Sequence, residues 1–140
     1  MMELERENAA AAHWTQEQYE FATSCEAHAQ RFAWVVENES GEASKVVAFL
    51  VAHKVDAEWE LENMAVAMLV RLRGIGTLLL EKLIEVARAQ SADCIFLEVR
   101  ESNKSAHALY QKVGFKETGL RKSYYADPAE NAILYRLTLY

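Results

Sequence analysis

The sequence contains few of the residues that mark disulfide-bonded, zinc-binding or disordered proteins. It has two cysteines, one proline and five glycines among 140 residues, of which 51% are hydrophobic. Cys25 and Cys94 lie far apart without a Cys-x-x-Cys or Cys/His spacing, so we expect buried thiols rather than a disulfide or a zinc site. The four histidines are scattered and predict no metal site: His13, His28, His53 and His107. The composition indicates one compact domain over residues 1–140.

Long hydrophobic runs and an excess of basic residues are also missing. The longest apolar stretches, Met64 to Val70 and Thr77 to Leu80, are too short to cross a bilayer, and the acidic start of the chain is unlike a signal peptide. We therefore expect a cytoplasmic protein with no membrane partner. A net charge of −6 disfavours direct nucleic-acid binding and suits a basic substrate.

The first third of the chain reads as helices followed by a hairpin. Alanine and glutamate favour a helix from Glu3 to Ala12, and a second helix is expected from Gln16 to His28 after Thr15, a residue suited to the N-cap. Strands are then predicted over 32–36 and 45–52, joined by the turn 38–42.

A third strand is predicted from Glu58 to Val66. Strand alternation places every second side chain on the same face. One face should carry Glu58, Glu60 and Glu62, and the other Trp59, Leu61 and Asn63.

The second half alternates helices with strands. Helices are expected over 74–90 and from Ser102 or Asn103 to Val113, where Gly114 ends the helix. Strands are expected over 94–99, 115–123 and 132–139. The order of hairpin, crossover and final strands predicts an α/β fold with a mixed sheet.

A basic, glycine-spaced turn links the third strand to the next helix. Gly74 and Gly76 leave the backbone open to a ligand, the following N–H groups are the unpaired donors of a helix start, and Arg71 and Arg73 add positive charge. The turn therefore predicts a site for a nucleotide-like anion. It has neither the lysine of a P-loop nor the third glycine of a dinucleotide fingerprint.

This turn and a second segment resemble the GNAT family of N-acetyltransferases. Arg-x-x-Gly-x-Gly is the family's pyrophosphate-binding pattern. Asn-x-x-Ala-x-x-Leu-Tyr-x-x-x-Gly-Phe, a family hallmark, occurs here as Asn103, Ala106, Leu109, Tyr110, Gly114 and Phe115. The segments 62–66, 97–103 and 121–125 resemble the RimI-like branch, which acetylates the N-terminal alanine of a ribosomal protein. The resemblance implies a mostly antiparallel mixed sheet flanked by helices, with acetyl coenzyme A as cosubstrate and no metal.

The resemblance also implies where the coenzyme binds. Backbone groups of Met64, Ala65 and Val66 would pair with the pantetheine arm. The pyrophosphate would be held by Arg71, Leu72, Arg73, Gly74, Ile75, Gly76 and Thr77. Asn103 would cap the second of the two helices and contact the coenzyme.

Glu98 and Tyr110 are the catalytic candidates carried over from the family. Glu98 would remove a proton from the acceptor amine, and Tyr110 would protonate the departing thiolate. Outside such a motif, Glu98 would be a carboxylate paired with Arg100, and Tyr110 a core aromatic residue. Glu60 and Glu62 are rival bases, because other branches of the family place the base on the earlier strand.

Two segments depart from the family pattern. Ala67 to Val70 is apolar where many members have Asp-Pro. The chain also begins within what resembles the family's first helix, so the first strand is expected to be absent. Either a partner chain, as in a homodimer, would cover the sheet edge left open, or the natural start lies upstream of Met1.

The acceptor is the least specified feature of the sequence. Trp14, Tyr124 and Tyr125 either line a peptide groove or serve in packing. Two other functions remain open: acetylation of a small amine such as an aminoglycoside or polyamine, and sensing of acyl coenzyme A without turnover.

Overall fold

The computed structural model describes residues 31–38 and 45–140. Within them, six strands form one sheet in the order β1-β2-β3-β4-β6-β5. The elements are β1 (Arg31–Asn38), β2 (Lys45–Val55), β3 (Glu58–Val66), the 3₁₀ helix η2 (Met68–Val70), α3 (Ile75–Ala89), β4 (Cys94–Arg100), α4 (Lys104–Val113), β5 (Lys116–Ala126) and β6 (Ala129–Thr138). The two predicted N-terminal helices, Trp14, Cys25 and the turn after Asn38 lie outside the described residues.

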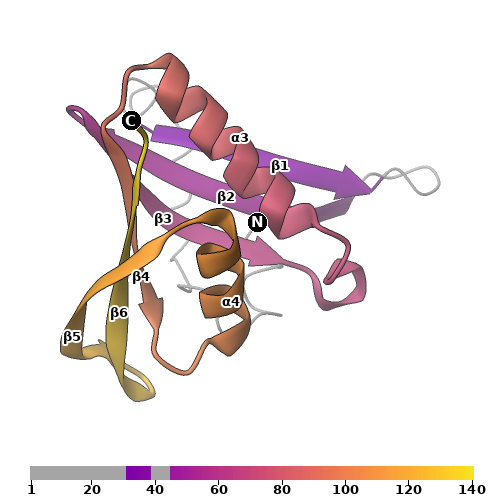
Figure 1. Ribbon diagram of the computed structural model, residues 1–140. Helices are drawn as coiled ribbons and strands as arrows, with labels where there is room; N and C mark the ends of the chain where they lie inside the picture. The colour runs from indigo at the N-terminus through magenta and orange to yellow at the C-terminus, as the bar shows by residue number, and fades with distance from the viewer. Residues whose placement is uncertain (1–30, 39–44) are drawn as a thin grey trace.

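The predicted mixed sheet is confirmed, and most of it is antiparallel. Each described pair of neighbouring strands is antiparallel except β3 and β4, which α3 connects as a crossover (Figure 1). The strands and helices predicted within the described residues are present with small shifts at their ends. The largest shifts are of three residues: β2 continues to Val55, β5 continues to Ala126 and β6 starts at Ala129.

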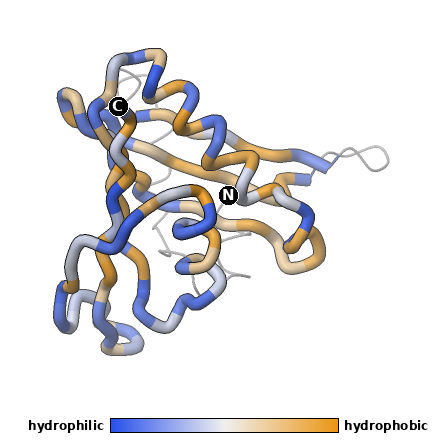
Figure 2. The backbone as a smooth tube through the Cα atoms, in the orientation of Figure 1, coloured by the Kyte–Doolittle hydropathy of each residue, from blue (hydrophilic) through white to orange (hydrophobic). Residues whose placement is uncertain are grey.

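The core lies between α3 and one face of the sheet. The helix buries Leu79, Leu80, Leu83 and Ala87, which pack with Trp59 and other sheet residues. Figure 2 shows hydrophobic residues running along the central strands, with more hydrophilic residues at the β5–β6 end. Cys94 is buried and unpaired, as predicted. No helix among the described residues is long and apolar enough to span a membrane.

A β-bulge in β3 corrects the predicted strand alternation. Glu62 is the extra residue, because Val51 pairs with Asn63 and Ala52 pairs with Leu61. A bulge of one residue reverses which side chains face the core. After it, Met64 and Val66 pack with the cluster that contains Trp59 and Leu61, so Asn63 does not share their face.

β3 and β4 diverge at their carboxyl ends. Their pairing ends at Leu61 and Leu97, although β3 continues to Val66 and β4 to Arg100. Figure 1 shows the ends of the two strands spreading apart, with α4 beside the opening. The sheet is therefore split at its centre.

Candidate active site

A cleft of about 490 Å³ opens where β3 and β4 diverge. It is lined by the end of β3, the glycine turn, the end of β4 and α4. The lining residues from the predicted site are Met64, Ala65, Val66, Arg71, Leu72, Gly74, Ile75, Gly76, Thr77, Glu98, Asn103 and Tyr110. Arg73 is exposed and is not among the residues that line the cleft. The structure thus gathers nearly all of the predicted site around one opening.

Gly74 makes the turn into α3 possible. It is the N-cap of the helix with φ of 78°, a left-handed conformation that costs other residues about 1–2 kcal/mol. No side chain caps this helix start. The first-turn N–H groups of an α-helix have no partners within the helix, so this end of α3 suits a bound anion.

Gly76 lies at a close contact that the sequence does not show. A Cβ atom at this position would lie 2.9 Å from Cδ2 of Leu109 on α4. Gly76 therefore allows α3 and α4 to approach each other closely at the cleft. This packing role adds to the predicted one of leaving the backbone open to a ligand.

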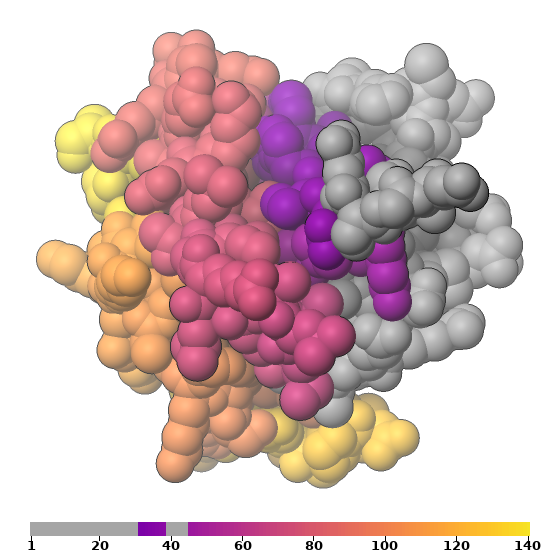
Figure 3. All heavy atoms as spheres, turned by 90° about the vertical axis from the view of Figure 1, so that its right-hand side faces the viewer, coloured from indigo at the N-terminus to yellow at the C-terminus, as the bar shows by residue number. Residues whose placement is uncertain are grey.

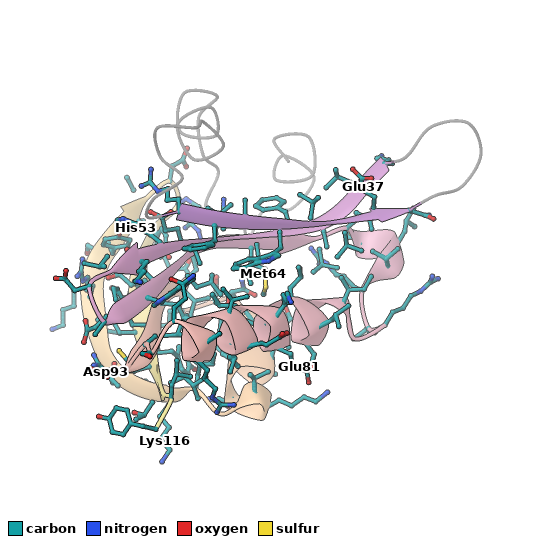
Figure 4. All side chains as sticks on the ribbon, turned by 90° about the horizontal axis from the view of Figure 1, so that it is seen from above. Glu37, His53, Met64, Glu81, Asp93 and Lys116 are labelled. Atoms are coloured by element: carbon teal, nitrogen blue, oxygen red, sulfur yellow. The ribbon has the colours of Figure 1, made fainter. Side chains whose placement is uncertain are left out.

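Arg71 folds back onto the end of β3. Its Nε donates a hydrogen bond of 3.0 Å to the backbone oxygen of Val66. This contact brings a guanidinium group to the strand end where the pantetheine arm is expected. Figure 4, in which Met64 is labelled, shows the neighbouring Met64 between the sheet and α3.

The apolar segment before the turn is exposed. Met68 is 71% exposed and Leu69 is 90% exposed, both in η2. Leu72, with φ of 63°, is also fully exposed. Figure 3 shows the atoms of this part of the chain on the surface between those of β1 and those of α4.

Glu98 lines the cleft from β4 and forms an ion pair with a residue of β5. Its Oε1 lies 3.1 Å from a terminal guanidinium nitrogen of Arg121 on β5. The alternative of pairing with Arg100 is wrong. The Arg100 guanidinium instead pairs with Glu130 at 3.5 Å and donates to the backbone oxygens of Asp127 and Pro128. The Arg100 guanidinium therefore binds the turn between β5 and β6.

Glu60 and Glu62, the two rival candidates for the base, have surroundings that differ from those of Glu98. Glu62 accepts two hydrogen bonds of 3.0 Å from the Arg31 side chain, a fork that occupies both of its oxygens. Glu60 does not line the cleft. Burial raises the pKa of Glu60, and the charges of Glu62 and Glu98 raise it further.

His53, Glu60 and Glu62 bring possible metal-ligand atoms within 4.8 Å of one another. Because the Arg31 fork already satisfies Glu62, this cluster is explained as an ion-pair network, and we propose no metal there.

Tyr110 points its buried ring into the region between α4, β6 and the cleft. It is 6% exposed, and it packs edge-on against Phe115 with ring centroids 5.7 Å apart. Burial raises the pKa of its phenol well above the ordinary value of 10.0. The hydroxyl therefore remains a proton donor at any working pH. The ring is both a core residue and part of the cleft lining.

Asn103 begins α4, as predicted. Its Oδ1 accepts a hydrogen bond of 3.2 Å from the backbone N–H of Ala106. Gly114 ends the helix with φ of 112°, also as predicted. Both ends of the helix that carries Tyr110 are thus fixed by local sequence.

His107 holds α4 in place and was missed in the sequence. One ring nitrogen lies 2.8 Å from the Tyr135 hydroxyl, and the other lies 3.1 Å and 3.0 Å from the backbone oxygens of Arg100 and Glu101. A scattered histidine gives no signal of such contacts. Its position four residues after the capping Asn103 is the clue, since it places the ring over the preceding turn.

Tyr125 joins the cleft through the β5–β6 hairpin. The guanidinium carbon of Arg100 lies 4.2 Å from the centroid of the Tyr125 ring. Tyr125 and Glu98 both line the cleft. Burial and the neighbouring Tyr124 raise the pKa of Tyr125 to about 12. Of the two expected roles, Tyr125 fits the cleft wall, while Tyr124 is half exposed beside it.

Comparison with known proteins agrees with this geometry. The model of the Acetyltransferase (GNAT) family matches residues 1–115. A [Ribosomal protein bS18]-alanine N-acetyltransferase from Haemophilus influenzae is 40% identical over 96 residues, 66% of this chain. The match spans 65% of that relative, slightly less than two thirds of its length.

Solved structures share the fold. The ribosomal-protein-S18-alanine N-acetyltransferase from Escherichia coli gives a TM-score of 0.82 at 28% identity, covering 99% of this chain and 84% of that chain. A GNAT family acetyltransferase from Elizabethkingia anophelis with acetyl-CoA bound gives a TM-score of 0.72 at 21% identity, covering 89% of this chain and 84% of that chain.

Proposed function

The chain belongs to the GNAT acetyltransferase family, and from that premise we propose that it transfers the acetyl group of acetyl coenzyme A to the N-terminal α-amino group of a protein. The proposed acceptor is a ribosomal protein that begins with alanine. The observation that carries this proposal is the cleft between β3 and β4, which is lined by the glycine turn, Glu98 and Tyr110 together.

The coenzyme would enter the cleft along β3. The end of this strand lies beyond its pairing with β4, so its backbone can pair with the amides of the pantetheine arm. The glycine turn and the start of α3 would hold the pyrophosphate. The family's coenzyme and the donors present at these positions therefore fit each other.

The two catalytic candidates would act on opposite sides of the acetyl group. Glu98 would take a proton from the acceptor ammonium, directly or through a water molecule, so that the nitrogen can attack the acetyl carbonyl carbon. When the carbon–sulfur bond breaks, the Tyr110 hydroxyl would protonate the departing thiolate. The products are an N-acetyl amine and free coenzyme A.

The acceptor assignment rests on relatives and charge. The relatives named as alanine N-acetyltransferases act on ribosomal protein bS18. A protein with net charge −6 also suits a basic ribosomal peptide. We propose the cytoplasm as the location, because acetyl coenzyme A and newly made ribosomal proteins occur there together.

The proposal is tested by following release of free thiol from acetyl coenzyme A with three acceptor classes. These are peptides that begin with alanine and copy the host's bS18, polyamines, and aminoglycosides. We expect the highest specificity constant with the alanine peptide. A higher value with a small amine would replace the acceptor, and coenzyme binding without thiol release in every mixture would indicate a sensor.

The base is tested by comparing two substitutions. Glu98→Gln is expected to lower kcat by about 10²- to 10⁴-fold at neutral pH, with less loss at high pH where the amine is already neutral. Glu60→Gln serves as the matched control and should retain most activity. The opposite pattern would move the base to β3.

A further inference from the structure

Arg121 is the ion-pair partner of the proposed base, although the two residues lie on strands that are not neighbours. In the sheet, β6 separates β4 from β5. Arg121 pairs with Ala132 of β6, and Glu98 pairs with Leu134 of the same strand. The two side chains therefore extend towards each other across β6, whose neighbours lie roughly 10 Å apart as two strand spacings, and meet with the guanidinium 3.1 Å from the carboxylate.

The two members of this pair differ in their freedom to move. The Glu98 side chain is 16% exposed, whereas that of Arg121 is 56% exposed. A carboxylate held in a cleft wall needs a cation or hydrogen-bond donors to offset its lost hydration. The exposed guanidinium supplies this charge without being buried itself, so it can leave when another cation arrives.

While it is paired with Glu98, the Arg121 guanidinium also lies against an aromatic ring. The Arg121 guanidinium carbon is 5.5 Å from the centroid of the Tyr124 ring, within the range of a cation–π contact. Tyr124 occupies this position because β5 bulges between Arg121 and Tyr125. The Asn131 side chain stabilises the bulge: its Oδ1 accepts a hydrogen bond of 2.9 Å from the backbone N–H of Ser123.

The acceptor of the proposed reaction arrives with the same charge. An N-terminal amine has a pKa of about 7.7 to 8.0, so most of it is an ammonium at neutral pH. The ammonium and the guanidinium are both cationic donors that seek the same carboxylate oxygen.

We infer that Arg121 holds the place of the acceptor ammonium on Glu98 while the acceptor is absent, and that acceptor binding displaces it from the carboxylate while its contact with the Tyr124 ring remains. This inference rests on the proposed function. One positive charge replaces another, so the carboxylate stays paired throughout binding. The proton then passes from the ammonium to Glu98 before the nitrogen attacks. Hydroxyl groups and water carry no charge and displace Arg121 poorly, so the pair selects for amines.

The test compares acceptor kinetics of Arg121→Gln, Arg121→Lys and a matched control, Arg136→Gln. Arg136 forms a similar ion pair with Glu58 at 2.7 Å, has a similarly exposed side chain, and lies outside the cleft. Removing the competitor should lower the KM of the alanine peptide by about 2- to 5-fold in Arg121→Gln, the range for an exposed ion pair. The KM of acetyl coenzyme A should not change. Arg121→Lys should restore a KM near that of the wild type, and Arg136→Gln should leave it unchanged.

An unchanged or higher acceptor KM in Arg121→Gln would overturn the inference, since it would mean that Arg121 binds or positions the acceptor rather than competing with it. A wild-type protein that acetylates no N-terminal amine would instead refute the proposed function. The two failures are therefore distinguishable.

A second measurement uses the wild-type protein and needs no stable variant. The Nε–H signal of Arg121 is followed by NMR in the presence of coenzyme A while a peptide is added. We expect the alanine peptide with a free amine to shift the signal and the same peptide with an acetylated amine to leave it in place. Equal responses to both peptides, or no response to the free amine, would contradict displacement by the ammonium.

Discussion

Gly76 lies where α3 and α4 approach each other closely. We predict that Gly76→Ala destabilises the wild-type protein but stabilises a Leu109→Ala variant. In Gly76→Ala, the new Cβ would lie 2.9 Å from Leu109 Cδ2, so the side chain of Leu109 or the helix must move. Overpacking of this kind costs about 1–3 kcal/mol. The gain in helix propensity from glycine to alanine is at most about 1 kcal/mol. The net change should therefore be a destabilisation of about 0 to 3 kcal/mol.

The reasoning is isolated by removing the residue that causes the crowding. In a Leu109→Ala background, only the propensity gain remains, so Gly76→Ala should stabilise the protein by up to about 1 kcal/mol. Differential scanning calorimetry of the four proteins in this cycle measures the effect, with about 2–4 °C in Tm expected per kcal/mol. Gly119→Ala is the matched control, because nothing lies within 4 Å of a Cβ there.

Titration of coenzyme A into the same proteins separates packing from binding. Gly76 and Leu109 both line the cleft, so Gly76→Ala should weaken coenzyme affinity while unfolding remains cooperative. If Gly76→Ala lowers Tm equally with and without Leu109, the contact between the helices is not the reason for this glycine. Unchanged coenzyme affinity would remove Gly76 from the proposed pyrophosphate site.

Three further predictions follow from single side chains. Tyr110→Phe should lower kcat with coenzyme affinity preserved, because only the hydroxyl is lost; near-normal kcat in an assay limited by chemistry would leave the ring a packing residue alone. Asn103→Ala should cost about 0.5–2 kcal/mol in a urea titration, because the Ala106 N–H loses its cap, whereas an unchanged midpoint would contradict this role. The pKa of Glu60 is raised, so its protonated form stabilises the fold below pH 4.5, and this contribution is lost as pH rises through the raised pKa. Glu60→Gln should therefore have a higher Tm than the wild type at pH 7, and the difference should disappear below pH 4.5.

Much of the fold could be predicted because its signals are local. Glycine positions, a capping asparagine and the alternation of apolar residues fix Gly74, Asn103 and Gly114 at the ends of helices. The glycine turn and the two catalytic candidates could be placed in one site only through the family resemblance, since they are separated along the chain.

The contacts that were missed depend on strand register. Whether Glu98 pairs with Arg100 or Arg121 is decided by how β4, β6 and β5 align, and this alignment includes a bulge that the residue pattern does not reveal. The bulge at Glu62 likewise reverses the faces of β3. The role of Gly76 depends on the distance between two helices, which no local pattern reports.

The position of the acetyl group on the product tests the central claim most directly. A peptide that begins with alanine, copies the host's bS18 and contains lysine is incubated with the protein and acetyl coenzyme A, and the product is fragmented in a mass spectrometer. The account predicts a single acetyl group on the α-amino nitrogen of the alanine, formed by the wild type and strongly reduced in Glu98→Gln. Acetyl groups found only on lysine side chains would contradict the proposed acceptor, and an unmodified peptide in every reaction would contradict the proposed activity.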